Sequence, residues 1–383
     1  MNRAEEAGVE LLFGHNLTSS DFNSMRHSNE TILRFGVEGG AAKKVIVNGP
    51  VIGADGAGSR LRYHLRDAGV LDFTEEFCVQ GYKEIEFPKN PNNPGGFCLQ
   101  REGLHIWPRT THFVMALANL DGSFTGTIYV DKENDPESFK ELNTPSKIRA
   151  FFQKHYSEAI PVLGGLDSIV HQMTENPVGL LGTVRCTSYN LGGHCCLLGD
   201  SAHAITPFFG QGTNASFEDC YILAELMAKH APAKNMTAIG LSRAFDAFTR
   251  ERKPNADAIA EMALDNFVEM RDRVGDAQFL LNKSVENVLE NHFEDKFRSR
   301  YAMVCYGGGG NITYDAALRL GEVNWGIVEE LTAKGSTGDN VDLVLAEQLI
   351  DARLVPLMAE MQVDLTQIVH SVDDLKAPVE SRL

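Results

Sequence analysis

Residues 195–229, CCLLGDSAHAITPFFGQGTNASFEDCYILAELMAK, decide the fold. The apolar run at 195–198 indicates a buried strand, and Asp200 follows it directly. A glycine-rich turn at 210–212 then leads into a helix predicted over 212–229, whose apolar residues recur at helical intervals. This order places an acceptor for ligand hydroxyls beside the electropositive start of a helix. We therefore expect an α/β fold with a ligand site at this turn.

A second strand, turn and helix pattern lies earlier in the chain. The segment KKVIVNGPVI, followed by Gly53, is rich in β-branched residues and predicts a buried strand that enters the tight loop GADGAGS. A short helix is expected from Ser59 to Arg66. Small residues in such a loop let the backbone approach a ligand closely, and amides at the helix start can meet phosphate charge. Taken alone, however, Gly-Asp-Gly is a common turn, and a structural role is then the favoured interpretation.

The rest of the chain divides into a strand-rich block and a helical block. Between 78 and 131, short strands separated by Pro, Gly and Asn clusters predict an antiparallel sheet, inserted into the α/β scaffold as a substrate domain. A helix is expected at 146–156, and helices dominate from 237 onward, with Pro254 kinking or breaking one of them. The predicted parts are a remainder of a parallel-sheet cofactor domain (1–75), the substrate domain (76–185), the cofactor domain again (186–235) and a helical C-terminal region (236–383).

Composition excludes some classes of function. The chain has 383 residues, and its 35 basic and 52 acidic residues give a formal charge of -17, which disfavours nucleic acid as a partner. Seven cysteines without a CxxC pair predict neither a disulfide framework nor a metal site, and they fit a reducing compartment. No apolar run is long enough to span a membrane, so the cytoplasm is the expected location. The final Ser381-Arg382-Leu383 resembles a variant peroxisomal address and carries little weight.

The two turn strings carry a resemblance to the FAD-dependent aromatic hydroxylases, in which GADG-type and GD-type strings occur in this order and flank the FAD. The resemblance implies bound FAD, with NADPH or NADH and O2 as co-substrates. In that family the GD aspartate, here Asp200, holds the ribityl chain, and the glycine-rich turn faces the flavin ring. The cofactor-binding residues implied by the match are Asp55, Gly56, Arg60, Asp200, Gly210, Gln211, Gly212, Thr213 and Asn214.

Six further strings resemble the kynurenine 3-monooxygenases within that family, in the right order: GYKEIEF (81–87), LHIWP (104–108), ANLDGSFTGT (118–127), PFFGQG (207–212), NFVEM (266–270) and RYAMV (300–304). The resemblance implies hydroxylation of L-kynurenine to 3-hydroxykynurenine, a step of tryptophan degradation and NAD biosynthesis. A flavin hydroperoxide is then the reagent, and no side chain is assigned a catalytic role. Asn266 and Tyr301 would reach the substrate carboxylate. An apolar pocket for the ring would be lined by Leu104, Phe113, Met115, Leu117, Tyr129, Pro207 and Phe208.

Other interpretations of the same residues remain open. Apolar strand residues such as Leu117 belong to a core more often than to a pocket, and His203 is expected to be structural. The chain could instead be a flavin hydroxylase for a phenol or a benzoate. It could also be a non-catalytic remnant, because residues 1–50 lack the GxGxxG fingerprint that grips the ADP half of FAD. Residues 5–22 resemble a stretch well inside the relatives, so we expect a chain that lacks their first βαβ unit.

The sequence gives no indication of the oligomeric state or of whether the chain holds FAD alone. A mitochondrial outer-membrane location follows only by analogy with relatives that carry a membrane anchor.

Overall fold

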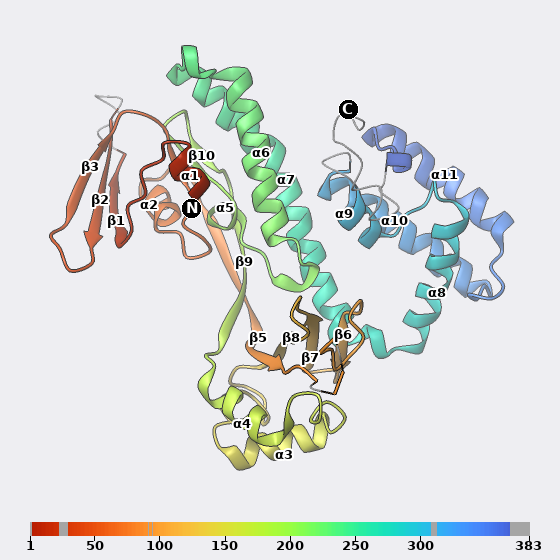
Figure 1. The fold of residues 1–383 in the computed structure, drawn as a ribbon. Coiled ribbons are helices and arrows are strands. Elements are labelled where there is room, and N and C mark those ends of the chain that lie inside the picture. The colour runs from red at the N-terminus through yellow and green to blue at the C-terminus, as the bar shows by residue number, and fades with distance from the viewer. Residues whose placement is uncertain (1, 23–29, 91, 94, 308–311, 368–383) are drawn as a thin grey trace. The chain divides into compact units, whose positions relative to one another are not determined.

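The chain forms two compact units in the computed structural model, which describes residues 2–22, 30–90, 92–93, 95–307 and 312–367 (Figure 1). The first unit comprises Met1–Glu76 and Gly182–Ala260, and the second comprises Phe77–Leu181 and Glu261–Leu383. Each unit therefore combines two separate stretches of sequence. The C-terminal tripeptide Ser381-Arg382-Leu383 lies outside the described residues.

The strands that lie wholly within the first unit form two small sheets. After the short helix α1 (Asn2–Glu6), the strands β1 (His15–Asp21), β2 (Thr31–Val37) and β3 (Lys43–Val47) pair in that order, antiparallel throughout. In the second sheet, β11 (Cys195–Leu197) pairs parallel with β4 (Val51–Gly53) and antiparallel with β10 (Asn190–Leu191). Parallel pairing among the strands assigned wholly to this unit is thus confined to β4 and β11.

The expected single buried strand ending at Gly53 is wrong. Asn48-Gly49-Pro50 interrupts it, and the two halves belong to different sheets: β3 pairs with β2, and β4 pairs with β11. Proline lacks the N–H that a strand interior needs, and glycine weakens a strand, so this tripeptide ends the pairing. β3 is mostly exposed, and only Gly53 of β4 is buried. The segment predicted to be one buried strand is therefore two short strands in two different sheets.

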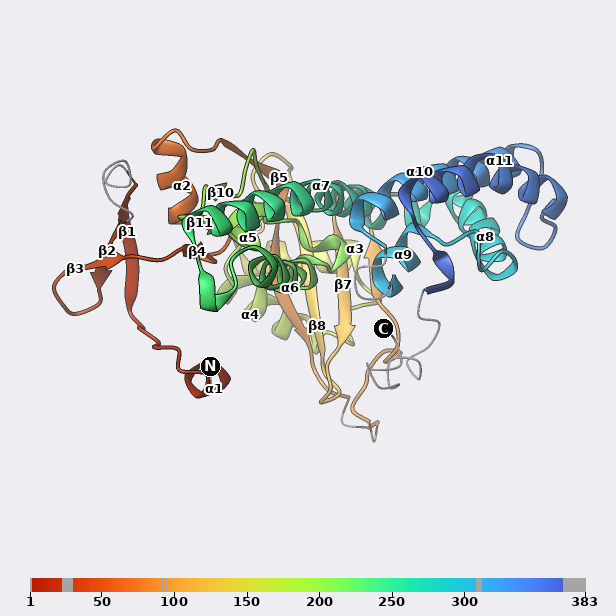
Figure 2. The ribbon, with the colours of Figure 1, turned by 90° about the horizontal axis from the view of Figure 1, so that it is seen from above.

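The helices of the first unit cover β11 and β4. The predicted short helix is confirmed as α2 (Arg60–Asp67), which Ser59 caps by accepting a hydrogen bond from the Arg62 N–H. After α5 (Asp200–His203) comes the predicted long helix, confirmed as α6 (Gly212–His230), which lies beside the first part of α7 (Ala238–Arg271) in Figures 1 and 2. The core beneath them contains Leu61, Leu65, Cys195, Cys196, Leu197, Leu223, Phe245 and Phe248.

Two of the expected helix features differ. The helix α7 runs without interruption across Pro254, so of the two expected effects, a kink or a break, the break is wrong. Proline removes one backbone hydrogen bond, but buried apolar side chains on both sides, Phe248 and Ile259 among them, hold the flanking turns in place. On α6, Phe217 and Tyr221 are largely exposed, so the apolar residues of this helix do not all face the core.

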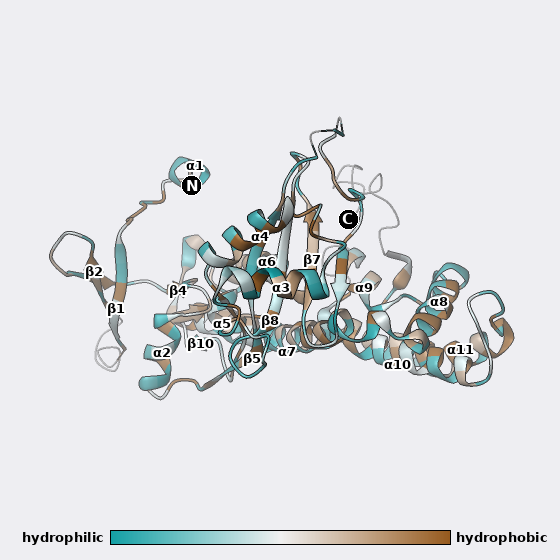
Figure 3. Ribbon diagram, turned by 90° about the horizontal axis from the view of Figure 1, so that it is seen from below, coloured by the Kyte–Doolittle hydropathy of each residue, from teal (hydrophilic) through white to brown (hydrophobic). Residues whose placement is uncertain are grey.

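The predicted antiparallel sheet belongs mainly to the second unit, although β5 begins and β9 ends within the sequence of the first unit. Its strand order is β6-β7-β8-β5-β9, with β5 (Phe73–Phe87), β6 (His105–Pro108), β7 (Phe113–Ala118), β8 (Phe124–Asp131) and β9 (Gly179–Cys186). The pairs β5–β8, β6–β7 and β7–β8 are antiparallel, as expected. One face packs on α3 (Pro145–His155) and α4 (Gly165–Glu175) through Val114, Ala116, Ile128, Val130, Phe151 and Phe152. Figure 3 shows β7 as a hydrophobic strand, in brown.

The C-terminal region is helical, as predicted. It contains α8 (Ala277–His292), α9 (Arg300–Tyr306), α10 (Tyr314–Ala333) and α11 (Leu343–Met361), which share a core that includes Val285, Leu289, Leu320, Ile327 and Ile350. Short 3-10 turns occur at Pro207–Phe209, Ala233–Asn235, Arg273–Gly275 and Leu365–Gln367. Among the described helices, none combines the length and the apolar character needed to cross a membrane.

Candidate functional site

A pocket of about 580 Å³ lies in the first unit, where the loop after β4, the turn after β11 and the start of α6 meet. Its volume falls within the usual range for small-molecule sites. Six residues expected from the sequence line it: Gly56, Asp200, Pro207, Gly210, Gly212 and Thr213. Four others of the predicted cofactor set, Asp55, Arg60, Gln211 and Asn214, are close in sequence but are not among the lining residues.

Gly199 makes the turn after β11 possible. Its backbone, at φ 58° and ψ -140°, lies in a region open almost only to glycine. A Cβ here would lie 2.8 Å from Ser216 Oγ on α6, so glycine also permits the close approach of that helix. The Gly199 N–H donates to Asp219 Oδ2 at 2.9 Å. The turn directs the next residue, Asp200, outward, and its exposed carboxylate lines the pocket.

The loop after β4 is held by its own side chains. Asp55 accepts hydrogen bonds from Ser59 Oγ at 2.5 Å and from the Leu61 N–H at 3.1 Å, so its carboxylate fixes the start of α2. Gly56 has a positive φ of 79° and no atom within 4 Å of the position of a Cβ. The loop thus presents backbone at the pocket, while Asp55 supports the loop's shape.

Arg62 ends the motif that begins at Asp55, which the family resemblance places near the flavin, but the sequence prediction assigned it no cofactor contact. It is fully buried, and its guanidinium donates to the Ser201 carbonyl (2.9 Å), the Ala57 carbonyl (2.5 Å) and Glu75 Oε1 (2.7 Å). It therefore ties the loop after β4 to α5, and so joins the two pocket-forming turns. Its place at the end of the Asp55–Arg62 motif is a signal in the sequence, but nothing there predicts that the side chain joins two turns.

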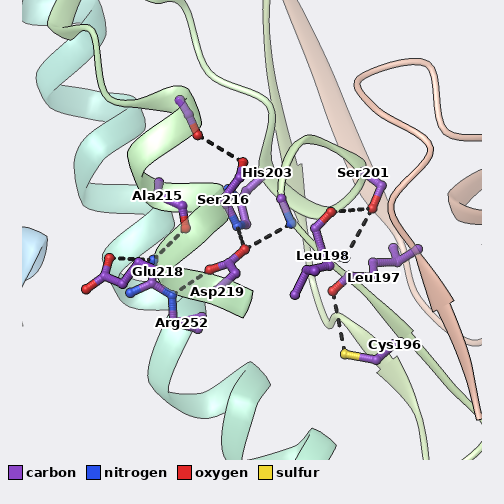
Figure 4. A network of polar contacts seen from close by, with 12 residues as sticks. Cys196, Leu197, Leu198, Ser201, His203, Ala215, Ser216, Glu218, Asp219 and Arg252 are labelled. Atoms are coloured by element: carbon purple, nitrogen blue, oxygen red, sulfur yellow. Dashed lines mark hydrogen bonds and ion pairs between the residues drawn. The ribbon is translucent and has the colours of Figure 1, made fainter. Parts of the chain in front are cut away.

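A buried ionic network lies behind the pocket (Figure 4). His203 Nε2 is 2.6 Å from Asp219 Oδ2, and Arg252 Nε donates to Asp219 Oδ1 at 2.6 Å. Burial alone would raise the pKa of Asp219, but hydrogen bonds and charge from His203 and Arg252 outweigh it and the net shift is downward. Arg252 also pairs with Glu218 at 2.9 Å. His203 is thus built into the support of α5, α6 and α7, as the structural interpretation expects.

The start of α6 supplies polar groups to the pocket. Gly210 adopts a positive φ of 68°, the N-cap Gln211 makes no side-chain capping bond, and the first turn contains no acidic residue. The N–H groups of this turn are therefore available to an acceptor. Thr206 Oγ1, in the pocket wall, is buried without a hydrogen-bond partner among the described residues. These donors, the Asp200 carboxylate and the glycine backbone fit a polyhydroxylated, partly anionic ligand, as the ribityl chain and phosphates of FAD are.

In the second unit, the predicted ring-contacting residues share one face of the sheet. Phe113 pairs with Tyr129, and the register places Met115 and Leu117 on the same side, while Leu104 comes just before β6, the strand that pairs with β7. This is the face turned away from the core formed with α3 and α4. Here the rings of Phe113 and Tyr129 stack with centroids 4.4 Å apart. Leu104 and Leu117 are each about half exposed, so this face offers apolar surface to a ligand.

Asn266 and Tyr301 lie in the second unit, on α7 and α9. The residues immediately before them, Asp265 on α7 and Arg300 on α9, form an ion pair at 3.1 Å. Tyr301 is 55% exposed, and partial burial, with Cys305 beside it, raises its pKa to about 12. The phenol therefore stays protonated and can donate a hydrogen bond. Pro207 and Phe208, the other two predicted ring contacts, belong to the first unit, where Pro207 lines the pocket.

Comparison with solved structures identifies the fold. An anhydrotetracycline hydroxylase from Streptomyces rimosus, OxyS, matches 76% of this chain and 52% of its own, with a TM-score of 0.51 at 20% identity. The tetrameric form of 2-methyl-3-hydroxypyridine-5-carboxylic acid oxygenase matches 71% of this chain and 65% of its own, with a TM-score of 0.51 at 16% identity. This chain thus spans between half and two thirds of those structures, and the likeness concerns the fold.

Comparison with known sequences identifies the family. The model of the FAD binding domain family matches residues 1–263. A protein of Myxococcus xanthus (strain DK1622) named kynurenine 3-monooxygenase is 39% identical over 364 residues, which are 94% of this chain and 73% of that protein. A protein of the same name from Stenotrophomonas maltophilia (strain K279a) is 36% identical, over 92% of this chain and 72% of its own length. The chain therefore belongs to the family of FAD-dependent monooxygenases that includes the kynurenine 3-monooxygenases.

Proposed function

We propose that this chain hydroxylates L-kynurenine to 3-hydroxykynurenine, consuming O2, a proton and NADPH or NADH, and releasing water and the oxidised nicotinamide. The observation that carries the proposal is the apolar sheet face of the second unit, on which Leu104 and Leu117 are about half exposed. The same unit also contains the Asn266 amide on α7 and the Tyr301 phenol on α9, and the residues just before these two form an ion pair. An aromatic amino acid needs both kinds of group: an apolar surface for its ring and donors for its carboxylate. Similarity to relatives named kynurenine 3-monooxygenase supports the same substrate.

In this proposal the first unit holds the cofactor. When bound, FAD takes up electrons from the nicotinamide and activates oxygen for transfer to the ring. Asp200 would accept hydrogen bonds from ribityl hydroxyls, and the open backbone at Gly210, Gly212 and Thr213 would lie against the flavin. Arg62 would act through the two turns it joins, as a positioning residue.

The second unit would position the substrate. Leu104, Met115 and Leu117 would contact the ring and exclude water, while the Phe113–Tyr129 stack supports the strands beneath. Burial raises the pKa of Tyr129 well above its usual value, so this phenol remains neutral in the apolar surroundings. Asn266 and Tyr301 would donate hydrogen bonds to the substrate carboxylate, which the protonated state of Tyr301 permits. No side chain is required to act as an acid or a base.

A turnover assay tests the substrate. The purified chain, loaded with FAD, should oxidise NADPH faster when L-kynurenine is added, and mass spectrometry should detect a product heavier by one oxygen. Tyr301→Phe and Asn266→Ala should raise KM about tenfold or more, which corresponds to the loss of one hydrogen bond to a charged group. The matched control is Tyr306→Phe, at the exposed end of the same helix, which should leave KM unchanged. Absence of any kynurenine-dependent oxidation in the flavin-loaded protein would refute the proposal.

The same assay distinguishes the alternatives. If phenols or benzoates stimulate NADPH oxidation and the two variants behave as wild type, the chain is a hydroxylase for another aromatic substrate. If the chain stays colourless after incubation with FAD and removal of the free cofactor, the remnant interpretation holds. We also place the reaction in a reducing compartment such as the cytoplasm, because all seven cysteines are free thiols.

A further inference from the structure

A cluster of metal-ligating groups lies in the second unit, outside the residues proposed for the hydroxylation. It consists of His112, Glu137 and His155. One ring nitrogen from each histidine and one carboxylate oxygen of Glu137 lie within 4.8 Å of one another. The three residues come from separate segments: the turn before β7, the connection after β8 and the last residue of α3. The fold, and not a local sequence pattern, brings them together.

The residues around His112 hold its ring in place. The side chain is 5% exposed, and its Nδ1 lies 2.6 Å from the Tyr156 hydroxyl. The ring also packs on Phe151, with centroids 4.9 Å apart, and edge-on against His155 at 4.7 Å. Its Nε2 makes no hydrogen bond within the described part of the chain. An imidazole fixed through one nitrogen, with the other nitrogen available, is the usual arrangement of a histidine that binds a metal.

The charge state of the cluster suits a cation. Burial, with a smaller contribution from His155, lowers the pKa of His112 to about 4, so that its ring is neutral near pH 7. Partial burial raises the pKa of Glu137, but hydrogen bonds from Lys154 and His155 outweigh this effect and the net shift is downward. A neutral imidazole and an ionised carboxylate are the ligating forms of these groups.

The cluster could instead be an ion-pair network that only stabilises the fold, because basic side chains surround it. Glu137 accepts from His155 Nε2 and from Lys154 Nζ, both at 2.8 Å. Arg109 lies nearby and pairs with Glu158, and Asp135 adds negative charge. Because Lys154 is 64% exposed, it can swing into solvent when an ion takes its place. The Arg109 charge is already balanced by Glu158.

We propose that His112, Glu137 and His155 bind a divalent transition-metal ion of the Zn²⁺ type, which joins the start of β7, the connection after β8 and the end of α3. Two imidazoles and one carboxylate are ligands that Zn²⁺ accepts, whereas Ca²⁺ and Mg²⁺ prefer oxygen ligands alone. Ligands about 2.1 Å from a tetrahedral ion are separated by roughly 3.4 Å, so small side-chain rotations close the site. Water would fill the fourth position. The role of the ion is to stabilise the second unit.

Titration of the full chain with metal tests the site without substrate or flavin, so its result is independent of the proposed hydroxylation. Calorimetry with Zn²⁺ should give one site per chain, and Glu137→Gln and His155→Gln should each weaken binding tenfold or more. His171→Gln, which removes an exposed histidine on α4, is the matched control and should bind as wild type does. Lys154→Met should tighten binding several-fold, because it removes the competing cation.

Cobalt distinguishes this site from binding by cysteines. Co²⁺ bound by nitrogen and oxygen ligands should show visible absorption without the strong near-ultraviolet band that thiolate ligands produce. The thermal unfolding temperature should rise with Zn²⁺ in wild type and in His171→Gln, and should not rise in Glu137→Gln. Binding that is equal in wild type, Glu137→Gln and His155→Gln, or that carries the thiolate band, would overturn the proposal, as would the absence of a one-to-one complex.

Discussion

The pocket of the first unit and the apolar sheet face of the second unit are built in different ways. The pocket depends on backbone: Gly199 and Gly210 take conformations with positive φ, and the start of α6 contributes its N–H groups. The sheet face depends on register, which aligns side chains such as Met115 and Leu117 from one strand with those of its neighbours. The residues that form the backbone site are consecutive in the sequence, whereas those that form the sheet face are far apart in the sequence. The first kind should therefore be sensitive to glycine replacement and the second to side-chain truncation.

The largest loss of stability is expected in the buried ionic network of His203, Asp219 and Arg252 beside the pocket. Asp219→Ala should destabilise the chain by about 3–5 kcal/mol, because it leaves Arg252 and His203 buried without their shared carboxylate. Urea unfolding monitored by circular dichroism measures this loss. Asp167→Asn breaks an exposed ion pair with Arg149 and should change stability little. Equal losses in the two variants would show that the buried network does not support the pocket.

Glycine replacement in the pocket should come next. Gly199→Ala adds a Cβ 2.8 Å from Ser216 Oγ in a backbone region that alanine avoids. It should lower the free energy of unfolding by about 2–4 kcal/mol, and the variant should no longer retain flavin. Gly58→Ala, in the neighbouring loop, meets no atom within 4 Å and should retain flavin as wild type does. Flavin absorbance after gel filtration is the measurement. A yellow Gly199→Ala protein would contradict the view that backbone geometry makes this site.

Acid should weaken the same network through Asp219. Its pKa is lowered below the ordinary 3.8 in the folded chain, so the unfolded chain binds the proton more readily. The stability that this carboxylate contributes is present above about pH 4 and is lost as the pH falls through the folded pKa. The unfolding free energy of wild type should therefore decline more steeply below about pH 4 than that of Asp219→Ala. Parallel curves for the two proteins would contradict this assignment.

The smallest effect on stability is expected on the sheet face. Leu117→Ala truncates a half-exposed side chain, so it should change the unfolding free energy by about 0.5 kcal/mol or less and leave flavin binding intact. It should nevertheless raise KM for kynurenine several-fold, because the ring loses apolar contact. Val344→Ala, at an exposed site on α11, should change neither quantity. A Leu117→Ala enzyme with wild-type KM would remove this face from the proposed substrate site.

The same contrast explains which features the sequence could predict. The strand, turn and helix at 195–230 followed from consecutive residues, and Asp200 could be placed at the pocket because Gly199 and a helix start surround it. The strands of the second unit were readable from alternation and turn residues. The role of Arg62 was not, because its partner Ser201 lies 139 residues away along the chain. The cluster of His112, Glu137 and His155 is likewise invisible in the sequence, since only the folded sheet and α3 bring these residues together.

The two cysteines of β11 can be used to measure how often this strand separates from its neighbours. Cys195 and Cys196 are fully buried beside β4, and burial raises the pKa of both thiols, so each is nearly inert while the strand stays paired. An alkylating reagent can reach them only during excursions that separate β11 from its neighbours. The rate at which they are labelled therefore measures how often this short parallel pair comes apart, on a timescale that a static pocket does not reveal.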